Sequence, residues 1–307
     1  MPLPVALLRS LLVAADLLAA SLPVAGLAAV VASARPASAL DAPSVTAEPQ
    51  KTGWPLSPEE EAYVLKPEYE RRPGAEVMQH KPELWPVVPA AGFWGGRSWL
   101  DTHAGLVKVA EANKGPIDIL LVGDSITMQW GAAWQKHFGG HKTVNIGIGG
   151  DKTQNVLWRL DHGGVAGLEP RLVVLMIGNN NMFFTPETGI APAARGIKAC
   201  ADNLREKFPT TEIVVVKVLP AHAPGHPFYE DIKRVNAALD GLHLDADPKT
   251  HVLDICPDMV EADGTLKKSL YAGDNVHLTP EGYDVYARRL APLAAQLLAA
   301  SRPTATP

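Results

Sequence analysis

Cysteine is scarce in this chain, with only Cys200 and Cys256 among 307 residues. One pair of thiols cannot supply the disulfide framework that stabilises small secreted domains, and their distance in space does not follow from the sequence. We interpret both as small, buried apolar side chains. No CxxC, HExxH or other metal-ligand spacing occurs. The sequence therefore argues against a structural or catalytic metal.

Basic residues are also in the minority. The chain has 28 Lys and Arg against 33 Asp and Glu, a formal net charge of −5 and a pI near 6.1. No Lys/Arg cluster is present, so nothing is available to neutralise phosphates and we expect no nucleic-acid partner. A hydrophobic content of 47% with 20% charged residues excludes fibrous and globally disordered classes.

The N-terminal third differs in composition from the rest. In residues 1–39, Arg9 precedes a long Ala/Leu/Val-rich run that ends in Ala37-Ser38-Ala39, a small-residue cleavage signal. We predict a signal peptide, with an uncleaved membrane anchor as the alternative because the run is long. Either one directs the folded part to a secreted or periplasmic location, and the chain would touch a membrane only through this segment.

Residues 40–98 form a Pro/Trp-rich extension. Trp54, Trp85 and Trp94, together with Trp99 at its boundary, supply four of the seven tryptophans. We favour a strap whose aromatics pack over the main domain, and the alternative is a rim that stacks on sugar rings. Residues 99–300 are the predicted main domain, and 301–307 are a tail.

Strand and helix patterns alternate through the main domain. A helical pattern near 99–113 stops at Lys114-Gly115-Pro116. Short apolar runs predict strands at 117–122, 143–148, 172–177, 213–219 and 251–255. Helices are expected at about 127–138, 153–162, 191–207, 228–243 and 280–299, the last one begun by Thr279-Pro280-Glu281. Five βα units predict an α/β fold: a doubly wound, parallel five-stranded sheet of order 2-1-3-4-5 with helices on both faces.

Residues 117–130 (IDILLVGDSITMQW) carry the clearest chemical signal. An apolar strand runs into Gly123-Asp124-Ser125 and then into a helix. A serine at such a turn can aim its hydroxyl into a cleft while its own backbone N–H points at developing negative charge. The alternative is that Ser125 only caps the helix.

Other polar or glycine-rich loops also follow predicted strands. They are GIGGD at 147–151, GNNN at 178–181 and DNVH at 274–277. Because the carboxyl ends of parallel strands meet at one edge of a sheet, these loops should converge on the serine. A serine, oxyanion donors and a histidine oriented by a carboxylate are what acyl transfer needs.

Each loop also has a purely structural interpretation. The glycines and asparagines could serve turns, and Asp274 with His277 could be a satisfied loop pair. GIGGD is not the GxGxxG dinucleotide fingerprint, so no Rossmann cofactor site is expected. The GxSxG nucleophile elbow fails because Thr127 replaces its second glycine, which excludes an α/β-hydrolase.

In combination, the four loops resemble the SGNH hydrolases, also called GDSL esterases. NIGIGGDKTQNVLWRL (145–160), IGNNN (177–181) and DNVHLTPEGY (274–283) are similar to the catalytic subunits of the platelet-activating-factor acetylhydrolases of the Ib type. The resemblance extends over about residues 100–300. Asn181 stands where many family members have aspartate, as it does in this branch.

The resemblance implies a role for each matching residue. Ser125 would be the nucleophile, His277 the general base, and Asp274 the group that orients the histidine ring. The oxyanion hole would consist of the backbone N–H groups of Ser125 and Gly150 and the side-chain amide of Asn180.

We therefore expect an exported serine esterase that removes a short acyl group, most of all acetyl, without a cofactor. An acetylated polysaccharide is a candidate substrate that the Trp-rich extension favours, although this extension sets the chain apart from the cytosolic acetylhydrolase subunits. Two alternatives remain: an O-acyltransferase acting on a glycan, and a non-catalytic glycan-binding module. A homodimer is a further alternative because family members can dimerise. The acyl length would depend on loops after Leu219 and around Phe183-Phe184.

Overall fold

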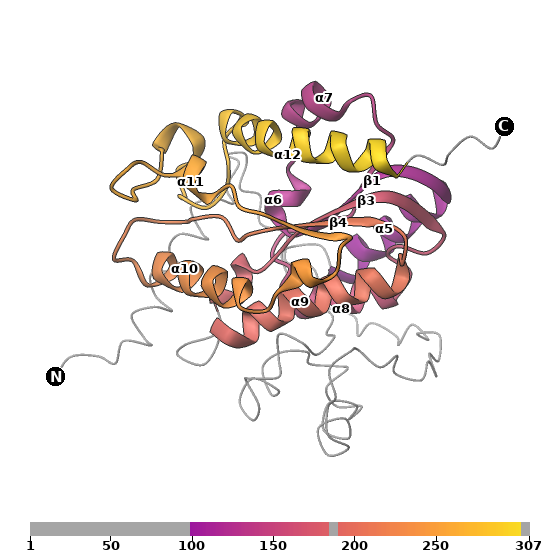
Figure 1. The fold of residues 1–307 in the computed structure, drawn as a ribbon, viewed down its shortest axis with the longest axis horizontal. Coiled ribbons are helices and arrows are strands. Elements are labelled where there is room, and N and C mark those ends of the chain that lie inside the picture. The colour runs from indigo at the N-terminus through magenta and orange to yellow at the C-terminus, as the bar shows by residue number, and fades with distance from the viewer. Residues whose placement is uncertain (1–98, 184–189, 302–307) are drawn as a thin grey trace, which may run out of the picture.

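The computed structural model describes residues 99–183 and 190–301 (Figure 1). The predictions for the signal segment, residues 40–98, Phe184 and residues 302–307 lie outside this part of the chain. One parallel sheet with the order β2-β1-β3-β4-β5 forms its centre, which confirms the predicted doubly wound fold. The strands are β1 (Gly115–Gly123), β2 (Thr143–Asn145), β3 (Leu168–Met176), β4 (Glu212–Val216) and β5 (Thr250–Leu253).

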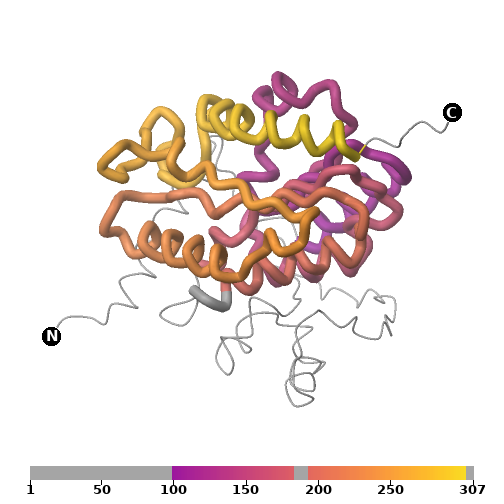
Figure 2. The backbone as a smooth tube through the Cα atoms, in the orientation of Figure 1, coloured from indigo at the N-terminus to yellow at the C-terminus, as the bar shows by residue number. Residues whose placement is uncertain are grey.

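Alternate strand residues face two separate cores because side chains in a strand alternate between faces. Leu120 and Val122 pack in the core beneath α5 (Trp99–Ala112), α8 (Thr153–Asp161), α9 (Ile190–Lys207) and α10 (Pro227–Asp240). Ile119 and Leu121 face the core that lies under α7 (Ala132–Phe138) and α12 (Pro280–Ala300). Figure 2 shows α12 in yellow returning over the same face as α7. The carboxyl-terminal halves of β1, β3 and β4 are therefore apolar on both faces, as a sheet covered on both sides requires.

Several predicted boundaries need correction. The single helix expected at 127–138 is wrong, because the segment forms α6 (Ser125–Met128) and α7 with a break at residues 129–131, where Gly131 caps α7. The second strand ends at Asn145 rather than 148, because the Asn145 side chain accepts the Gly147 N–H and donates to Thr127 O. β4 and β5 also end earlier than expected, at Val216 and Leu253. Shorter elements complete the fold, namely η2 (Asn179–Phe183), η3 (Leu244–Ala246), α11 (Cys256–Met259) and η4 (Lys268–Leu270).

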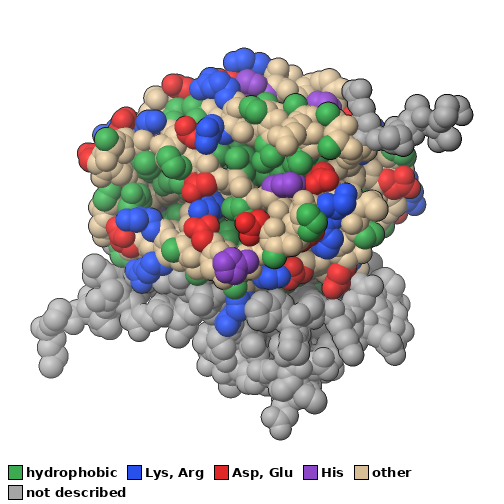
Figure 3. All heavy atoms as spheres, viewed as in Figure 1, with side chains coloured by type: hydrophobic (Ala, Val, Ile, Leu, Met, Phe, Trp, Pro, Cys, Tyr) green, Lys and Arg blue, Asp and Glu red, His purple; other side chains and the backbone are tan. Residues whose placement is uncertain are grey.

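The predicted cap of the last helix is present, since Thr279 Oγ1 accepts the N–H of Gly282. Cys200 is buried, as expected, whereas Cys256 is only partly buried, and both thiols are free. No helix within residues 99–183 and 190–301 is both long and apolar enough to cross a membrane. On the face seen in Figure 3, acidic and basic side chains are intermingled.

Candidate active site

Ser125 lies at the carboxyl end of β1, where it is the first residue of the one-turn helix α6. The preceding residue, Asp124, caps this helix by accepting the N–H of Ile126 at 3.0 Å. On the opposite side, the Tyr283 hydroxyl from α12 donates to Ile126 O at 2.7 Å. A short helix has little stability of its own, so these two contacts fix the direction in which Ser125 points.

Glycine is required immediately before this turn. A Cβ atom at Gly123 would lie 2.1 Å from Met176 O of the neighbouring strand and 2.2 Å from Thr127 Oγ1. Both distances are far below contact range, so any side chain would push α6 away from β3. The glycine of the GDS tripeptide thus lets the serine-bearing helix sit directly on the strand ends.

His277 lies in the loop before α12 and joins Ser125 to Asp274. Its Nε2 is 2.9 Å from Ser125 Oγ, and its Nδ1 is 2.6 Å from Asp274 Oδ2. The other carboxylate oxygen, Asp274 Oδ1, accepts the backbone N–H groups of Val276 and His277, each at 3.0 Å. The structure therefore brings together the three residues that the sequence singled out for nucleophile, base and orienting group.

The two carboxyl groups near Ser125, those of Asp274 and Asp124, have pKa values shifted in opposite directions. Burial raises the pKa of Asp274, but hydrogen bonds from the His277 ring and from two backbone N–H groups outweigh it, so the pKa is below its ordinary value. Burial raises the pKa of Asp124 to about 7, against the opposing effects of the Ile126 N–H and His277. Asp274 is thus the anionic partner of the histidine, whereas Asp124 is a buried helix cap.

The three predicted oxyanion donors lie at the ends of neighbouring strands β1, β2 and β3. Gly150 adopts φ of +80°, a left-handed conformation that favours glycine. The backbone N–H groups of Ser125 and Gly150 donate to no other described residue. Asn180 Nδ2 donates to Asp151 O at 2.9 Å, and because an amide nitrogen carries two hydrogens, one remains for a ligand.

Asn181 does not take part in this cluster. It is buried, and its side chain bonds Thr153 and Gln154 at the start of α8. The asparagine in place of the family's usual aspartate therefore serves the packing of α8. Within the described residues, no group of three or more His, Cys, Asp and Glu side chains could hold a metal ion.

Sequence reasoning missed the residues behind the oxyanion donors, Asp151 and Arg159. Arg159 lies in the helical stretch predicted at 153–162, between the buried residues Val156 and Leu160. An arginine on the apolar stripe of a helix was the available signal, because a buried charge requires a partner.

The chain is similar in sequence and in fold to known proteins. The model of the GDSL-like lipase/acylhydrolase family matches residues 121–285. Platelet-activating factor acetylhydrolase IB subunit alpha1 of Pongo abelii is 33% identical over 215 residues, which are 69% of this chain and 89% of the relative. The alpha2 subunit of Rattus norvegicus is 32% identical over 212 residues, 68% of this chain and 89% of the relative. The crystal structure of a GDSL-like lipase from Bacteroides thetaiotaomicron superposes with a TM-score of 0.53 at 20% identity, covering 63% of this chain and 97% of that one, and shares the fold.

Proposed function

The chain belongs to the GDSL-like lipase/acylhydrolase family, and from this we propose that it is a serine esterase that hydrolyses short-chain esters, acetyl esters above all. Ester hydrolysis in general follows from the family. The observation that carries the mechanism is the continuous hydrogen-bonded line from Asp274 through His277 to Ser125, with separations of 2.6 and 2.9 Å.

In the proposed mechanism, Ser125 Oγ attacks the ester carbonyl carbon while His277 Nε2 takes the hydroxyl proton. Asp274 stabilises the resulting imidazolium. The tetrahedral oxyanion is held by the N–H groups of Ser125 and Gly150 and by the Asn180 amide. His277 then protonates the departing alcohol, and a water molecule, activated by the same ring, hydrolyses the acyl-serine and restores the enzyme.

The preference for acetyl is supported by the relatives, which are acetylhydrolases and are 33% and 32% identical to this chain. The alcohol half of the substrate is a separate question. We propose an acetylated carbohydrate, on the ground that the Trp-rich residues 40–98 offer aromatic rings of the kind that stack on sugars.

We further propose that the enzyme is exported, because residues 1–39 combine Arg9, an apolar run and Ala37-Ser38-Ala39. Expression of the full chain in a bacterial host should yield a mature extracytoplasmic protein that begins at Leu40, as judged by intact-mass measurement. Recovery of the unprocessed chain from the cytoplasm would contradict export.

Hydrolysis of p-nitrophenyl acetate, butyrate and octanoate by the purified full chain tests the acyl preference. We expect kcat/KM to fall by roughly 10-fold or more from acetate to octanoate, because even one methylene that a small pocket must exclude can change it by about that factor. An equal kcat/KM for the acetate and the octanoate would disprove the acetyl preference, but it would still support ester hydrolysis. Turnover that depends on an added sugar acceptor and far exceeds hydrolysis would instead identify an O-acyltransferase.

A further inference from the structure

An arginine without exposed surface lies directly behind the candidate oxyanion donors. The Arg159 guanidinium reaches from α8 to the carboxyl edge of the sheet and donates in three directions. Its partners are Asp151 Oδ2 at 2.7 Å, Ile146 O at 2.6 Å and Gly123 O at 3.2 Å. One side chain therefore ties the end of β1, the loop after β2 and the carboxylate that follows Gly150.

Asp151 extends this connection to the remaining donor. Its backbone carbonyl accepts the side-chain amide of Asn180 at 2.9 Å, while its Oδ1 accepts the indole N–H of Trp99 at 2.6 Å. Gly150 is its neighbour in the chain. Ser125 lies two residues after Gly123, whose carbonyl accepts a hydrogen bond from Arg159. Each of the three oxyanion donors is therefore bonded to, or close in the chain to, a residue that contacts Arg159.

The ion pair itself is fully buried, with side-chain exposures of 1% for Arg159 and 0% for Asp151. Burial raises the pKa of Asp151 to about 6, opposed chiefly by Arg159 and Trp99, whose hydrogen bonds to the two carboxylate oxygens favour the ionised form. Two charges removed from water add little net stability compared with apolar side chains of the same volume, but they fix geometry closely. Because the pair contributes little net stability, we attribute its presence to the groups that it holds in place, namely the carbonyls of Ile146 and Gly123 and the Asn180 amide.

We propose that Arg159, Asp151 and Trp99 act as a positioning unit for the oxyanion hole. The unit holds the Gly150 peptide and the Asn180 amide where the tetrahedral intermediate develops charge, and none of its three side chains needs to touch the substrate. This inference rests on the proposed esterase function and deepens it.

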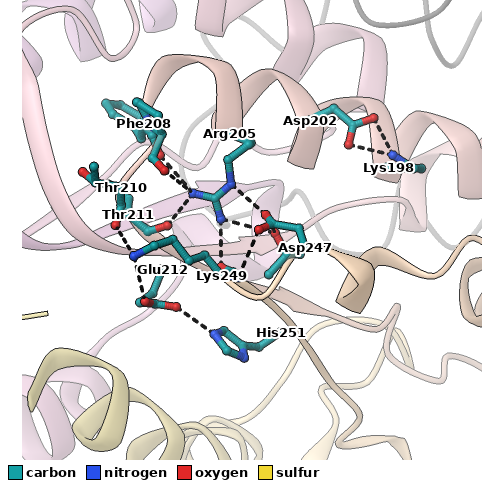
Figure 4. A network of polar contacts seen from close by, with 12 residues as sticks. Lys198, Asp202, Arg205, Phe208, Thr210, Thr211, Glu212, Asp247, Lys249 and His251 are labelled. Carbon is teal, nitrogen blue, oxygen red and sulfur yellow. Dashed lines mark hydrogen bonds and ion pairs between the residues drawn. The ribbon is translucent and has the colours of Figure 1, made fainter. Parts of the chain in front are cut away.

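A second arginine network supplies a matched control at the opposite edge of the sheet (Figure 4). Arg205 of α9 likewise donates to a carboxylate, Asp247 Oδ2, at 2.7 Å. It also donates to Thr211 O at 2.6 Å and to Lys249 O at 2.9 Å, next to the amino ends of β4 and β5. The two arginines thus join strands in similar ways, but only Arg159 adjoins the candidate site.

The test compares three variants of the full chain in p-nitrophenyl acetate hydrolysis, with melting temperature measured alongside kcat and KM. Arg159→Lys keeps the charge but replaces three separate donor nitrogens with one ammonium nitrogen, which cannot reach all three partners at once. Trp99→Phe keeps an aromatic ring but removes the donor to Asp151. We expect kcat to fall by about 10- to 100-fold in both, with KM nearly constant, because small displacements of transition-state donors reduce turnover by such factors. Arg205→Lys should lower the melting temperature and leave kcat unchanged.

A double variant separates positioning from a general loss of stability. If Arg159 acts partly through Asn180, Arg159→Lys should reduce kcat by a smaller factor in an Asn180→Ala background than in the wild type. A folded Trp99→Phe protein with the kcat of the wild type would overturn the proposal. The proposal would also fail if Arg159→Lys lowered kcat by the same factor in the wild-type and Asn180→Ala backgrounds. If Arg159→Lys does not fold, the Trp99→Phe result decides alone. A wild-type chain inert on every ester would overturn the proposed function itself, which is a different result.

Discussion

Alanine in place of Ser125 should lower the turnover of p-nitrophenyl acetate by a factor of about 10⁴ to 10⁶, and alanine in place of His277 should do nearly the same. The two side chains are 2.9 Å apart, and in the proposed mechanism they share one proton transfer, so either deletion should remove the attack. For the same reason, the double variant should lose little more than either single variant. The measurement is kcat for all three proteins under identical conditions.

Ser269→Ala is the matched control for this experiment. Ser269 is exposed and belongs to η4, and it is the backbone carbonyl of Ser269, not its side chain, that accepts the Thr279 hydroxyl. The control should keep the wild-type rate and melting temperature. A Ser125→Ala protein that remained folded and kept its rate would show that another group is the nucleophile, and the acyl-serine mechanism would be wrong.

The fold was predictable because its signals are local and repeated. Residues 119–122 are apolar on both faces of the strand, and a short run of this kind is typical of a strand covered on both sides. The doubly wound arrangement followed from the alternation of strands and helices and from right-handed connections, and the order 2-1-3-4-5 is one of the common orders of such sheets. The helix at 127–138 was mispredicted because most of its residues suit a helix. In the structure Gly131 caps a new helix, and the Asn145 side chain, which is distant in the sequence, bonds Thr127 O. A pattern of apolar residues reveals neither contact.

The candidate triad was predictable for a different reason. Asp274 and His277 are three residues apart in one loop, and parallel strands bring Ser125 to the same edge of the sheet. The positioning unit was not predictable, because Trp99 and Asp151 are 52 residues apart and meet only in the folded chain. Trp99 had been grouped with the extension tryptophans, yet it begins α5 and is 2% exposed.

Alanine in place of Asn180 should lower kcat for p-nitrophenyl acetate by a factor of about 10² to 10³, with little change in KM. The Asn180 amide already gives one hydrogen to Asp151 O at 2.9 Å, so the other is oriented before the substrate arrives. A donor held in advance favours the oxyanion over the neutral carbonyl, since the interaction strengthens as charge develops. The loss should therefore affect the chemical step rather than binding.

Asn203→Ala is the control that distinguishes a specific loss of kcat from the loss of stability expected when any buried asparagine is removed. Asn203 is buried in α9, and its side chain donates to Asp161 at 3.3 Å, away from the site. Its replacement should lower the melting temperature while leaving kcat unchanged. If Asn180→Ala instead raised KM and kept kcat, Asn180 would bind substrate and transition state equally, and the oxyanion hole would be reduced to the backbone N–H groups of Ser125 and Gly150.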